Sequence, residues 1–313
     1  MYGQLMVFTG NAHPDLASSI CQHIGVPLGR AEVFEFSNEN VFVRILDPVR
    51  EQDVFVVQPT CSPVSRSTME LLIMLDALKR ASAARITAVV PYYAYGRSDK
   101  KDQPRVPITA RLIADLMTVA GANRVLAIDL HAPQIQGFFG IPVDEMTALR
   151  LLAQHFAHKK LPNAVAVAPD FGAAKRARNF AEILGVPMAL IEKRREPASG
   201  RLELLNVIGD VAGKRAIIVD DEIDSASTVT QTARVLEEAG AAETYACCTH
   251  PVLSGPAIER LRDSNIRELV VTDTVPVPKH KRLPFITIVS VAPLLAEAMK
   301  RIHSGGSVGA LFR

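Results

Sequence analysis

Short apolar runs rich in β-branched residues alternate with helix-like stretches along the whole chain. The strands that this pattern predicts cover residues 54–57, 86–90, 125–128, 164–167, 216–219, 244–248 and 269–271. Continuous apolar runs of this length are typical of strands buried on both faces of a parallel sheet under covering helices. The alternation therefore predicts an α/β fold with mainly parallel sheets flanked by helices.

A change near residues 144–150 divides the strand pattern into two similar sets. The chain has 313 residues, and its 48% of apolar residues can fill two cores. We therefore expect one domain at 1–147 and a second at 148–313, although no sharp internal repeat shows that they share a fold. The predicted helix at 68–80 is apolar around most of its girth, so it is either sandwiched inside its domain or placed at a subunit contact.

The stretch from Ile217 to Val229 joins an apolar strand to two adjacent carboxylates, a loop of small residues and a helix. Backbone amides of such a loop can converge on a phosphate, and the helix N-terminus adds partial positive charge. The carboxylates of Asp220 and Asp221 suit sugar hydroxyls or hydrated Mg²⁺. An acidic pair at a strand end can also be only a helix cap, but the small residues favour a sugar-phosphate site.

Other polar residues follow predicted strands. His131 and Asp170 each come just after one, where ligands bind in open parallel sheets, and they could share a divalent ion through waters. A lone histidine is more often structural.

Residues 91–101 are aromatic and then basic, which suits a base and its phosphates or a solvated loop. Residues 192–200 open with three cations and continue as a Pro/Ser/Gly loop, which fits a mobile lid over a polyphosphate.

Global composition narrows the function classes. The net charge of +2 does not indicate nucleic acid or an anionic membrane as a partner, and no apolar run reaches membrane-spanning length. The N-terminus lacks the pattern of a signal peptide. The four cysteines show no metal-binding spacing, and Cys247 and Cys248, adjacent in an apolar strand-like run, are expected to be buried, reduced thiols, so the cytoplasm is the expected compartment.

Taken together and in order, these motifs resemble the ribose-phosphate pyrophosphokinase family over essentially the whole chain. The resemblance also includes 69–82, 105–110, 129–139 and 249–255. It implies two phosphoribosyltransferase-type domains, assembly into homohexamers built from dimers, and Mg²⁺ as cofactor. The implied reaction transfers the diphosphoryl group of ATP to the C1 hydroxyl of ribose 5-phosphate, giving phosphoribosyl pyrophosphate and AMP.

The resemblance also implies roles for individual residues. Lys193 and Arg195 match the catalytic lid cations, and His131 and Asp170 match positions near the metal. Residues matching the ribose 5-phosphate site are Asp220, Asp221, Asp224, Ser225, Ala226, Ser227 and Thr228. Residues matching the nucleotide segments, some of them supplied by a neighbouring subunit, are Phe36, Asn38, Glu39, Asn40, Arg97, Ser98, Asp99 and His131.

Several positions depart from the family pattern. Residues 36–40 read Phe-Ser-Asn-Glu-Asn instead of Phe-Ser-Asp-Gly-Glu, and Ser98 stands where Gln is usual. The sugar-phosphate loop lacks its usual Gly, so Ser227 is expected to adopt the geometry of that site. Because the sugar and lid residues are kept, we expect activity, with the changes bearing on nucleotide affinity and donor choice. The alternatives are a phosphoribosyltransferase that uses the product, or a non-catalytic regulatory relative.

Overall fold

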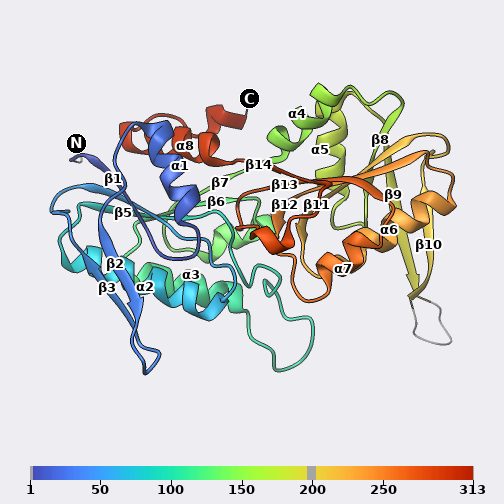
Figure 1. Ribbon diagram of the computed structural model, residues 1–313. Coiled ribbons are helices and arrows are strands. Elements are labelled where there is room, and N and C mark those ends of the chain that lie inside the picture. Colours follow the sequence, from blue (N-terminus) through green and yellow to red (C-terminus); the bar gives the residue numbers. More distant parts are fainter. Residues whose placement is uncertain (1–2, 196–201, 313) are drawn as a thin grey trace. The chain divides into compact units, whose positions relative to one another are not determined.

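The computed structural model describes residues 3–195 and 202–312 and is built from parallel sheets and helices (Figure 1). The predicted α/β class is confirmed. Contacts divide the chain into two units. The first contains the chain up to residue 147 with 274–276 and residues from 290 onward, and the second contains 148–273 and 277–289. The expectation from sequence had placed residues 290–313 with the C-terminal half.

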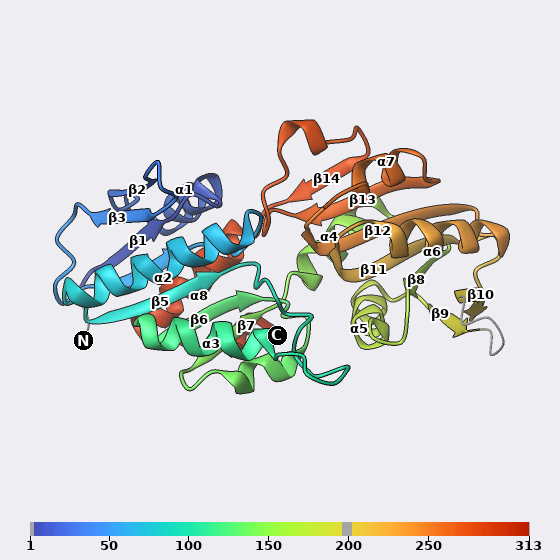
Figure 2. The same ribbon diagram turned by 90° about the horizontal axis from the view of Figure 1, so that it is seen from below.

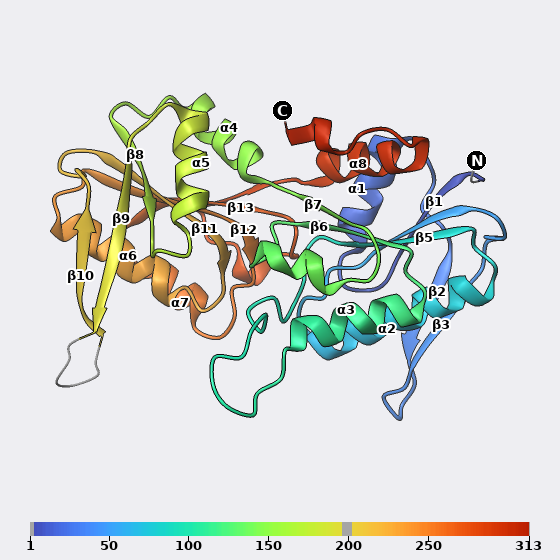
Figure 3. The ribbon, with the colours of Figure 1, turned by 180° about the vertical axis from the view of Figure 1, so that it is seen from behind.

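The first unit is a five-stranded parallel sheet in the order β1-β4-β5-β6-β7, with helices on both faces. Helices α1 and α8 cover one face, and α2 and α3 cover the other (Figures 1 and 3). Its elements are β1 (Leu5–Thr9), α1 (Pro14–Ile24), β2 (Ala31–Glu35), β3 (Val41–Ile45), β4 (Asp53–Val57), α2 (Val64–Arg80), β5 (Arg85–Val90), α3 (Thr109–Ala120), β6 (Arg124–Ile128), β7 (Val143–Met146) and α8 (Ala292–Ser304). Strands β2 and β3 form a separate antiparallel hairpin.

A buried ion pair joins the C-terminal helix α8 to this sheet. Asp53, at the start of β4, is completely buried and accepts hydrogen bonds from Arg85 Nε at 2.7 Å and Nη2 at 2.5 Å. The same guanidinium donates to the Ile302 carbonyl at 2.9 Å, and His303 Nδ1 lies 2.7 Å from Asp53 Oδ2. One carboxylate therefore connects two strands with the last helix of the chain.

The second unit is a seven-stranded sheet in the order β10-β9-β8-β11-β12-β13-β14, in which all pairings are parallel except that of the edge strand β10 with β9. Its elements are α4 (Leu149–Lys159), β8 (Ala164–Ala168), α5 (Ala174–Leu184), β9 (Met188–Arg195), β10 (Leu202–Ile208), β11 (Arg215–Ile223), α6 (Ser227–Glu238), β12 (Glu243–Pro251), α7 (Ala257–Arg262), β13 (Ile266–Thr272) and β14 (Ile286–Val289). All seven strands predicted from the sequence are confirmed in β4, β5, β6, β8, β11, β12 and β13.

The two units share one strand order. An isolated parallel bridge places Leu28 beside Val7 of β1, which is where β9 lies beside β8 in the second unit. The following strands, β4 to β7, then occupy the same order as β11 to β14. This agreement supports the hypothesis that one fold is used twice, which the sequence suggested without a visible repeat.

Helix α2 contains the apolar stretch that had two interpretations. Its buried residues include Leu71, Met74, Leu75 and Leu78, which pack into the core of the first unit, while Met69 is 47% exposed. Packing inside the first unit therefore explains why most of the circumference of α2 is apolar. Among the described helices, none combines the length and hydropathy needed to cross a bilayer.

All four cysteines are buried and unpaired, which confirms the prediction for Cys247 and Cys248 and extends it to Cys21 and Cys61. Burial raises the pKa of Cys21 and of Cys61 to about 11 and raises the pKa of Cys247 and Cys248 further. At pH 8 only about one thiol in a thousand would then be ionised, and none is accessible. We expect iodoacetamide to label none of the four in the folded chain at pH 8 and all four in denaturant, as mass spectrometry can show. Rapid labelling without denaturant would contradict this burial.

Candidate active site

The candidate site is built on β11, which lies between β8 and β12 in the sheet of the second unit. The apolar residues 216–219 fix this strand in the core, and Asp220 and Asp221 follow where the neighbouring strand β8 has already ended. Ligands bind in α/β proteins at this carboxyl edge of the sheet, so the fold presents both carboxylates at the expected place.

Three carboxylates converge at this edge. Asp220 Oδ1 accepts a hydrogen bond from the Asp221 backbone N–H at 2.9 Å. Asp220 is enclosed by protein on most sides, and this burial raises its pKa well above the usual range, with further contributions from the negative charges of Asp221 and Asp170. Asp170 follows β8, and its Oδ1 accepts from the Ala173 N–H at 3.1 Å at the start of α5. The raised pKa indicates negative charge that a cation or hydroxyl donors would stabilise.

These three carboxylates are of the right chemistry to bind a Mg²⁺ ion that keeps most of its water ligands. Carboxylate oxygens are the protein ligands that Mg²⁺ prefers, and the ion is often held by only one or two of them. Within residues 3–195 and 202–312, no three His, Cys, Asp or Glu side chains are placed to hold a metal ion directly. Any such ion would therefore be held through one or two of these carboxylates and water.

The loop after β11 is held by the loop after β12. The Ser254 hydroxyl donates to the Asp224 carboxylate, and the Ser254 N–H donates to the Asp224 carbonyl at 3.0 Å. Arg260 Nη1 donates to the Ser225 carbonyl at 2.9 Å. Asp224 therefore positions the loop. Ser254 and Arg260 had no role in the sequence analysis, although residues 249–255 were already part of the resemblance.

The N-terminus of α6 is open to an anion. The amides of the first turn of any helix have no intrahelical acceptor. The cap residue here is Ala226, whose side chain cannot accept a hydrogen bond from them. Ser225 and Thr228 flank this turn with hydroxyl groups. Backbone amides and the helix dipole together suit a phosphate monoester at this position.

The strained residue of this loop differs from the expected one. Ala226 adopts the left-handed conformation, with φ 61° and ψ 6°, whereas Ser227 begins the helix. The expectation that Ser227 takes the geometry usually given to glycine is therefore wrong. Buried Ala226 carries this conformation, which is less favourable for alanine than for glycine.

In the first unit, four predicted nucleotide residues lie together. The loop with Arg97, Ser98 and Asp99 passes so close to His131 that a Cβ on Gly96 would lie 3.2 Å from the His131 Cβ. Gln134 Nε2 donates to the buried Asp99 carboxylate at 2.7 Å, which fixes the loop. Gln134 lies in a segment that is similar to the family, but its contact with Asp99 was not predicted.

The other predicted nucleotide residues form the tip of the β2–β3 hairpin. Phe36 N–H donates to the Asn40 carbonyl and Glu39 N–H to the Phe36 carbonyl, both at 2.9 Å, and Asn38 Oδ1 accepts from the Asn40 N–H at 3.3 Å. The Phe36 side chain is 49% exposed. Figures 1 and 2 both show the tip well apart from the loop with Arg97, so one chain does not bring the two segments together.

The roles predicted for four residues are not tested by the structure. Lys193 and Arg195 belong to the end of β9, but their side chains lie outside the described part of the structure, as does the loop at 196–201. His131 belongs to the first unit and Asp170 to the second, so their sharing of one ion is a prediction that the structure does not test.

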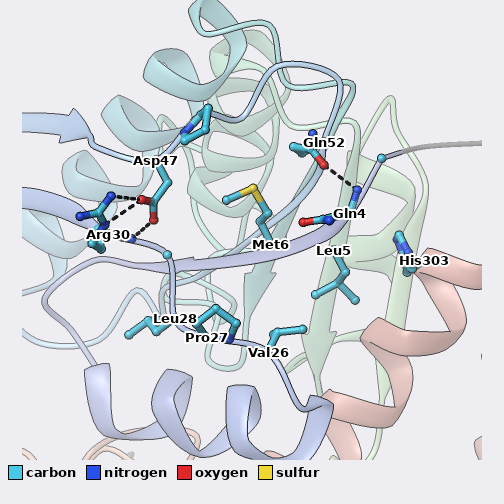
Figure 4. A pocket seen from close by; sticks show the side chains of 13 residues that line it. Gln4, Leu5, Met6, Val26, Pro27, Leu28, Arg30, Asp47, Gln52 and His303 are labelled. Carbon is cyan, nitrogen blue, oxygen red and sulfur yellow. Dashed lines mark hydrogen bonds and ion pairs between the residues drawn. The ribbon is translucent and has the colours of Figure 1, made fainter.

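A separate cavity of about 950 Å³ lies beside the edge strand β1 (Figure 4). Leu5, Val26 and Pro27 give it apolar walls, and its polar groups include the Arg30–Asp47 ion pair at 2.7 Å. None of the predicted site residues lines this cavity. It is therefore distinct from the candidate active site.

A helix-covered parallel sheet with an acidic pair and a helix N-terminus at its carboxyl edge places this chain among the α/β proteins that can bind a phosphorylated ligand at that edge. Two family models match the chain. Residues 5–121 match the N-terminal domain of ribose phosphate pyrophosphokinase, and 198–313 match the phosphoribosyl synthetase-associated domain. The chain belongs to the ribose-phosphate pyrophosphokinase family.

Individual relatives agree with the family models. The chain is 56% identical over 309 residues to ribose-phosphate pyrophosphokinase of Caldanaerobacter subterraneus, covering 98% of each protein. It is 51% identical to that of Clostridium perfringens, covering 99% of this chain and 98% of the relative. Phosphoribosylpyrophosphate synthetase from Mycobacterium smegmatis has a similar structure, with a TM-score of 0.92, 42% identity, and coverage of 97% and 100%.

Proposed function

We propose that this chain transfers the diphosphoryl group of Mg-ATP to the C1 hydroxyl of ribose 5-phosphate, giving 5-phosphoribosyl 1-pyrophosphate and AMP. The observation that carries this proposal is the pairing of the Asp220–Asp221 carboxylates with the uncapped N-terminus of α6. One end of this arrangement suits a phosphate monoester and the other suits vicinal hydroxyls. The full-length similarity to ribose-phosphate pyrophosphokinases supports the same reaction.

In this mechanism, the amides and hydroxyls from Ser225 to Thr228 bind the 5-phosphate, and Asp220 and Asp221 accept hydrogen bonds from the ribose hydroxyls. This orients the C1 oxygen, which attacks the β-phosphorus of ATP as the bond to the AMP oxygen breaks. Phosphoryl transfer of this kind depends on alignment and on cations where charge develops. Lys193 and Arg195 would supply these cations from the end of β9.

Magnesium is the cofactor that the proposal requires. The carboxylates of Asp170, Asp220 and Asp221 supply oxygen ligands of the right kind, directly or through water, and His131 would lie near the polyphosphate. When bound, the ion neutralises phosphate charge and helps to align the polyphosphate. The raised pKa of Asp220 supports this assignment because a nearby cation would favour its ionised form.

The nucleotide would use two segments of the first unit. Arg97, Ser98, Asp99 and His131 form one of them, and the hairpin tip with Phe36, Asn38, Glu39 and Asn40 forms the other. The separation of the two segments in one chain supports a site completed by a neighbouring subunit, as in the proposed hexamer of dimers. The four unpaired thiols support the cytoplasm as the proposed compartment.

The decisive assay measures AMP release from ATP with ribose 5-phosphate and without a nucleobase. The proposal expects AMP and phosphoribosyl pyrophosphate in equal amounts. A phosphoribosyltransferase would release no AMP under these conditions and would need a base together with phosphoribosyl pyrophosphate. A chain that is inactive alone but changes the rate of an active partner would be a regulatory relative instead.

Asp220→Asn is expected to weaken ribose 5-phosphate binding about tenfold or more and ATP binding less, because it removes a charged hydrogen-bond acceptor. Titration calorimetry of both ligands measures this difference. Asp210→Asn is a suitable control because Asp210 is an exposed residue that pairs with Lys214 before the start of β11, away from the carboxylates. Equal losses for both ligands would contradict the assignment of Asp220 to the sugar.

The same variant also tests the electrostatics of the site. Because the pKa of Asp220 is raised by folding, the ligand-free chain loses stability as pH rises from the ordinary aspartate pKa of about 3.9 through the raised value. The Asp220→Asn variant does not ionise at this position, so its stability does not fall in this way as pH rises. Its melting temperature should therefore exceed that of the natural chain at neutral pH, and the difference should disappear near pH 4.

A further inference from the structure

The repeated fold allows each position of the sugar-phosphate site to be located in the first unit. In both units the central strand pair begins in the same register, with Leu5 opposite Asp53 and Ala164 opposite Arg215. Five residues after Asp53 comes Gln58, as Asp220 comes five residues after Arg215. Six residues after Leu5 comes Asn11, as Asp170 comes six residues after Ala164.

The equivalent positions therefore differ in charge. Where the second unit has the carboxylates of Asp220 and Asp170, the first has the neutral amides of Gln58 and Asn11. On the helix that follows the strand, the charge difference is reversed, because the charged residue is in the first unit. Glu70 lies on α2, twelve residues after Gln58, whereas the residues twelve and thirteen after Asp220, Thr232 and Ala233 on α6, are both uncharged.

The Glu70 carboxylate is surrounded by hydrogen-bond donors. Its side chain is 2% exposed, yet it accepts from Asn11 N–H at 2.9 Å, Asn11 Nδ2 at 3.0 Å and Gln58 Nε2 at 3.0 Å. Arg66 Nε adds a fourth donor at 3.2 Å. These four N–H groups, one of them from a cation, form an anion-binding arrangement of the kind that holds phosphate or carboxylate.

The Gln58 side chain fills the space between the Glu70 carboxylate and the backbone of residues 10–12. A Cβ on Gly10 would lie 2.7 Å from the Gln58 side chain, so this side chain lies directly on the Gly10 backbone. Gln58 Oε1 also accepts from the Ala12 N–H at 3.2 Å, and its Nε2 donates to the Ser67 carbonyl at 3.2 Å. The residues that would face a ligand instead hydrogen-bond to one another.

We infer that the first unit contains a closed counterpart of the sugar-phosphate site, in which the carboxylate of Glu70 takes the place of a bound anion. This inference rests on the proposed function of the second unit. It explains why a chain with two similar units should bind a single sugar phosphate. It also gives Glu70 a positioning role, because Asn11 Nδ2 donates to Val33 and Arg66 pairs with Glu35, both on the hairpin strand β2.

Chemical rescue tests the anion site. Glu70→Ala removes a CH₂–COO⁻ group and leaves the four donors around a space that acetate can fill. We expect the melting temperature of this variant to fall by roughly 10 °C, and acetate to restore part of the loss in a saturable manner relative to chloride at equal ionic strength. The natural chain should melt alike in both salts. An unchanged melting temperature, or equal melting in both salts for the variant, would overturn the inference.

A second test does not depend on the cavity variant folding. Asn11→Asp places a second carboxylate against Glu70 and should lower the melting temperature by roughly 5 °C, whereas adding Glu70→Gln should remove most of this loss. Additive effects in the double variant would overturn the inference. Neither test needs substrate, so a chain that shows both effects but releases no AMP would refute only the proposed function.

Discussion

Lys193→Ala is expected to lower turnover about 10²–10³-fold while ribose 5-phosphate binding changes little. A cation that meets charge only as it develops in the transition state contributes roughly 3–4 kcal/mol to the reaction and little to substrate binding. Lys193 belongs to the last residues of β9, whose backbone pairs with β10 from Arg195 opposite Leu202 at the start of the predicted lid. Steady-state turnover and calorimetric titration with ribose 5-phosphate measure the two quantities separately.

The matched control for this prediction is Lys214→Ala. Lys214 lies before β11, at the opposite end from the carboxylates, and pairs with Asp210. Its removal should leave turnover within about twofold, since it lies away from the reacting groups. If Lys193→Ala retained full turnover, the lid cation would have no part in the mechanism.

Arg85→Ala is expected to destabilise the chain by about 3–5 kcal/mol, because it leaves the fully buried Asp53 carboxylate without its bidentate partner. It also removes the hydrogen bond to the Ile302 carbonyl, so α8 loses an attachment to the sheet. Denaturant unfolding monitored by circular dichroism measures the loss. The active-site loops of the second unit contain none of these residues.

Arg80→Ala provides the comparison, because Arg80 makes an ion pair of the same chemistry with Asp76 on the exposed surface of α2. Exposed pairs of this kind contribute about 0.3–0.5 kcal/mol. Similar losses for both variants would show that the burial of Asp53 carries no special cost. A loss confined to Arg85→Ala would assign the energy to the buried network.

The strands could be predicted from the sequence because central parallel strands are buried on both faces and contain continuous apolar runs. Every residue of β4 and β8 is buried. Strands β2 and β3 were not predicted because they form a hairpin that is only partly buried, in which polar residues such as Glu32 and Arg44 interrupt the pattern. Edge strands lack the uniform burial that makes a strand recognisable.

The site could be predicted only where local sequence determines local geometry. Asp220 and Asp221 follow an apolar strand directly, so their place at the sheet edge follows from the fold. The role of Asp224 could not be derived because its partner, Ser254, lies thirty residues away in the sequence. The left-handed residue could not be placed either, since Ala226 and Ser227 are both small and the turn geometry decides between them.

A similar left-handed residue occurs in the hairpin. Glu39 has φ 66° at the position where the family usually has glycine, so the backbone geometry is kept without the usual residue. This conformation costs a non-glycine residue about 1 kcal/mol.

The position of α8 has a consequence for how the protein is made. Helix α8, which packs on α1 and contacts Asp53 through His303, follows every strand of the second unit in the sequence. Domains generally fold in order as the chain leaves the ribosome, with the N-terminal one first. Here the first unit is complete only once α8 has been translated, and by then all strands of the second unit have been made, so the two units are expected to be completed in the reverse of the order in which they begin.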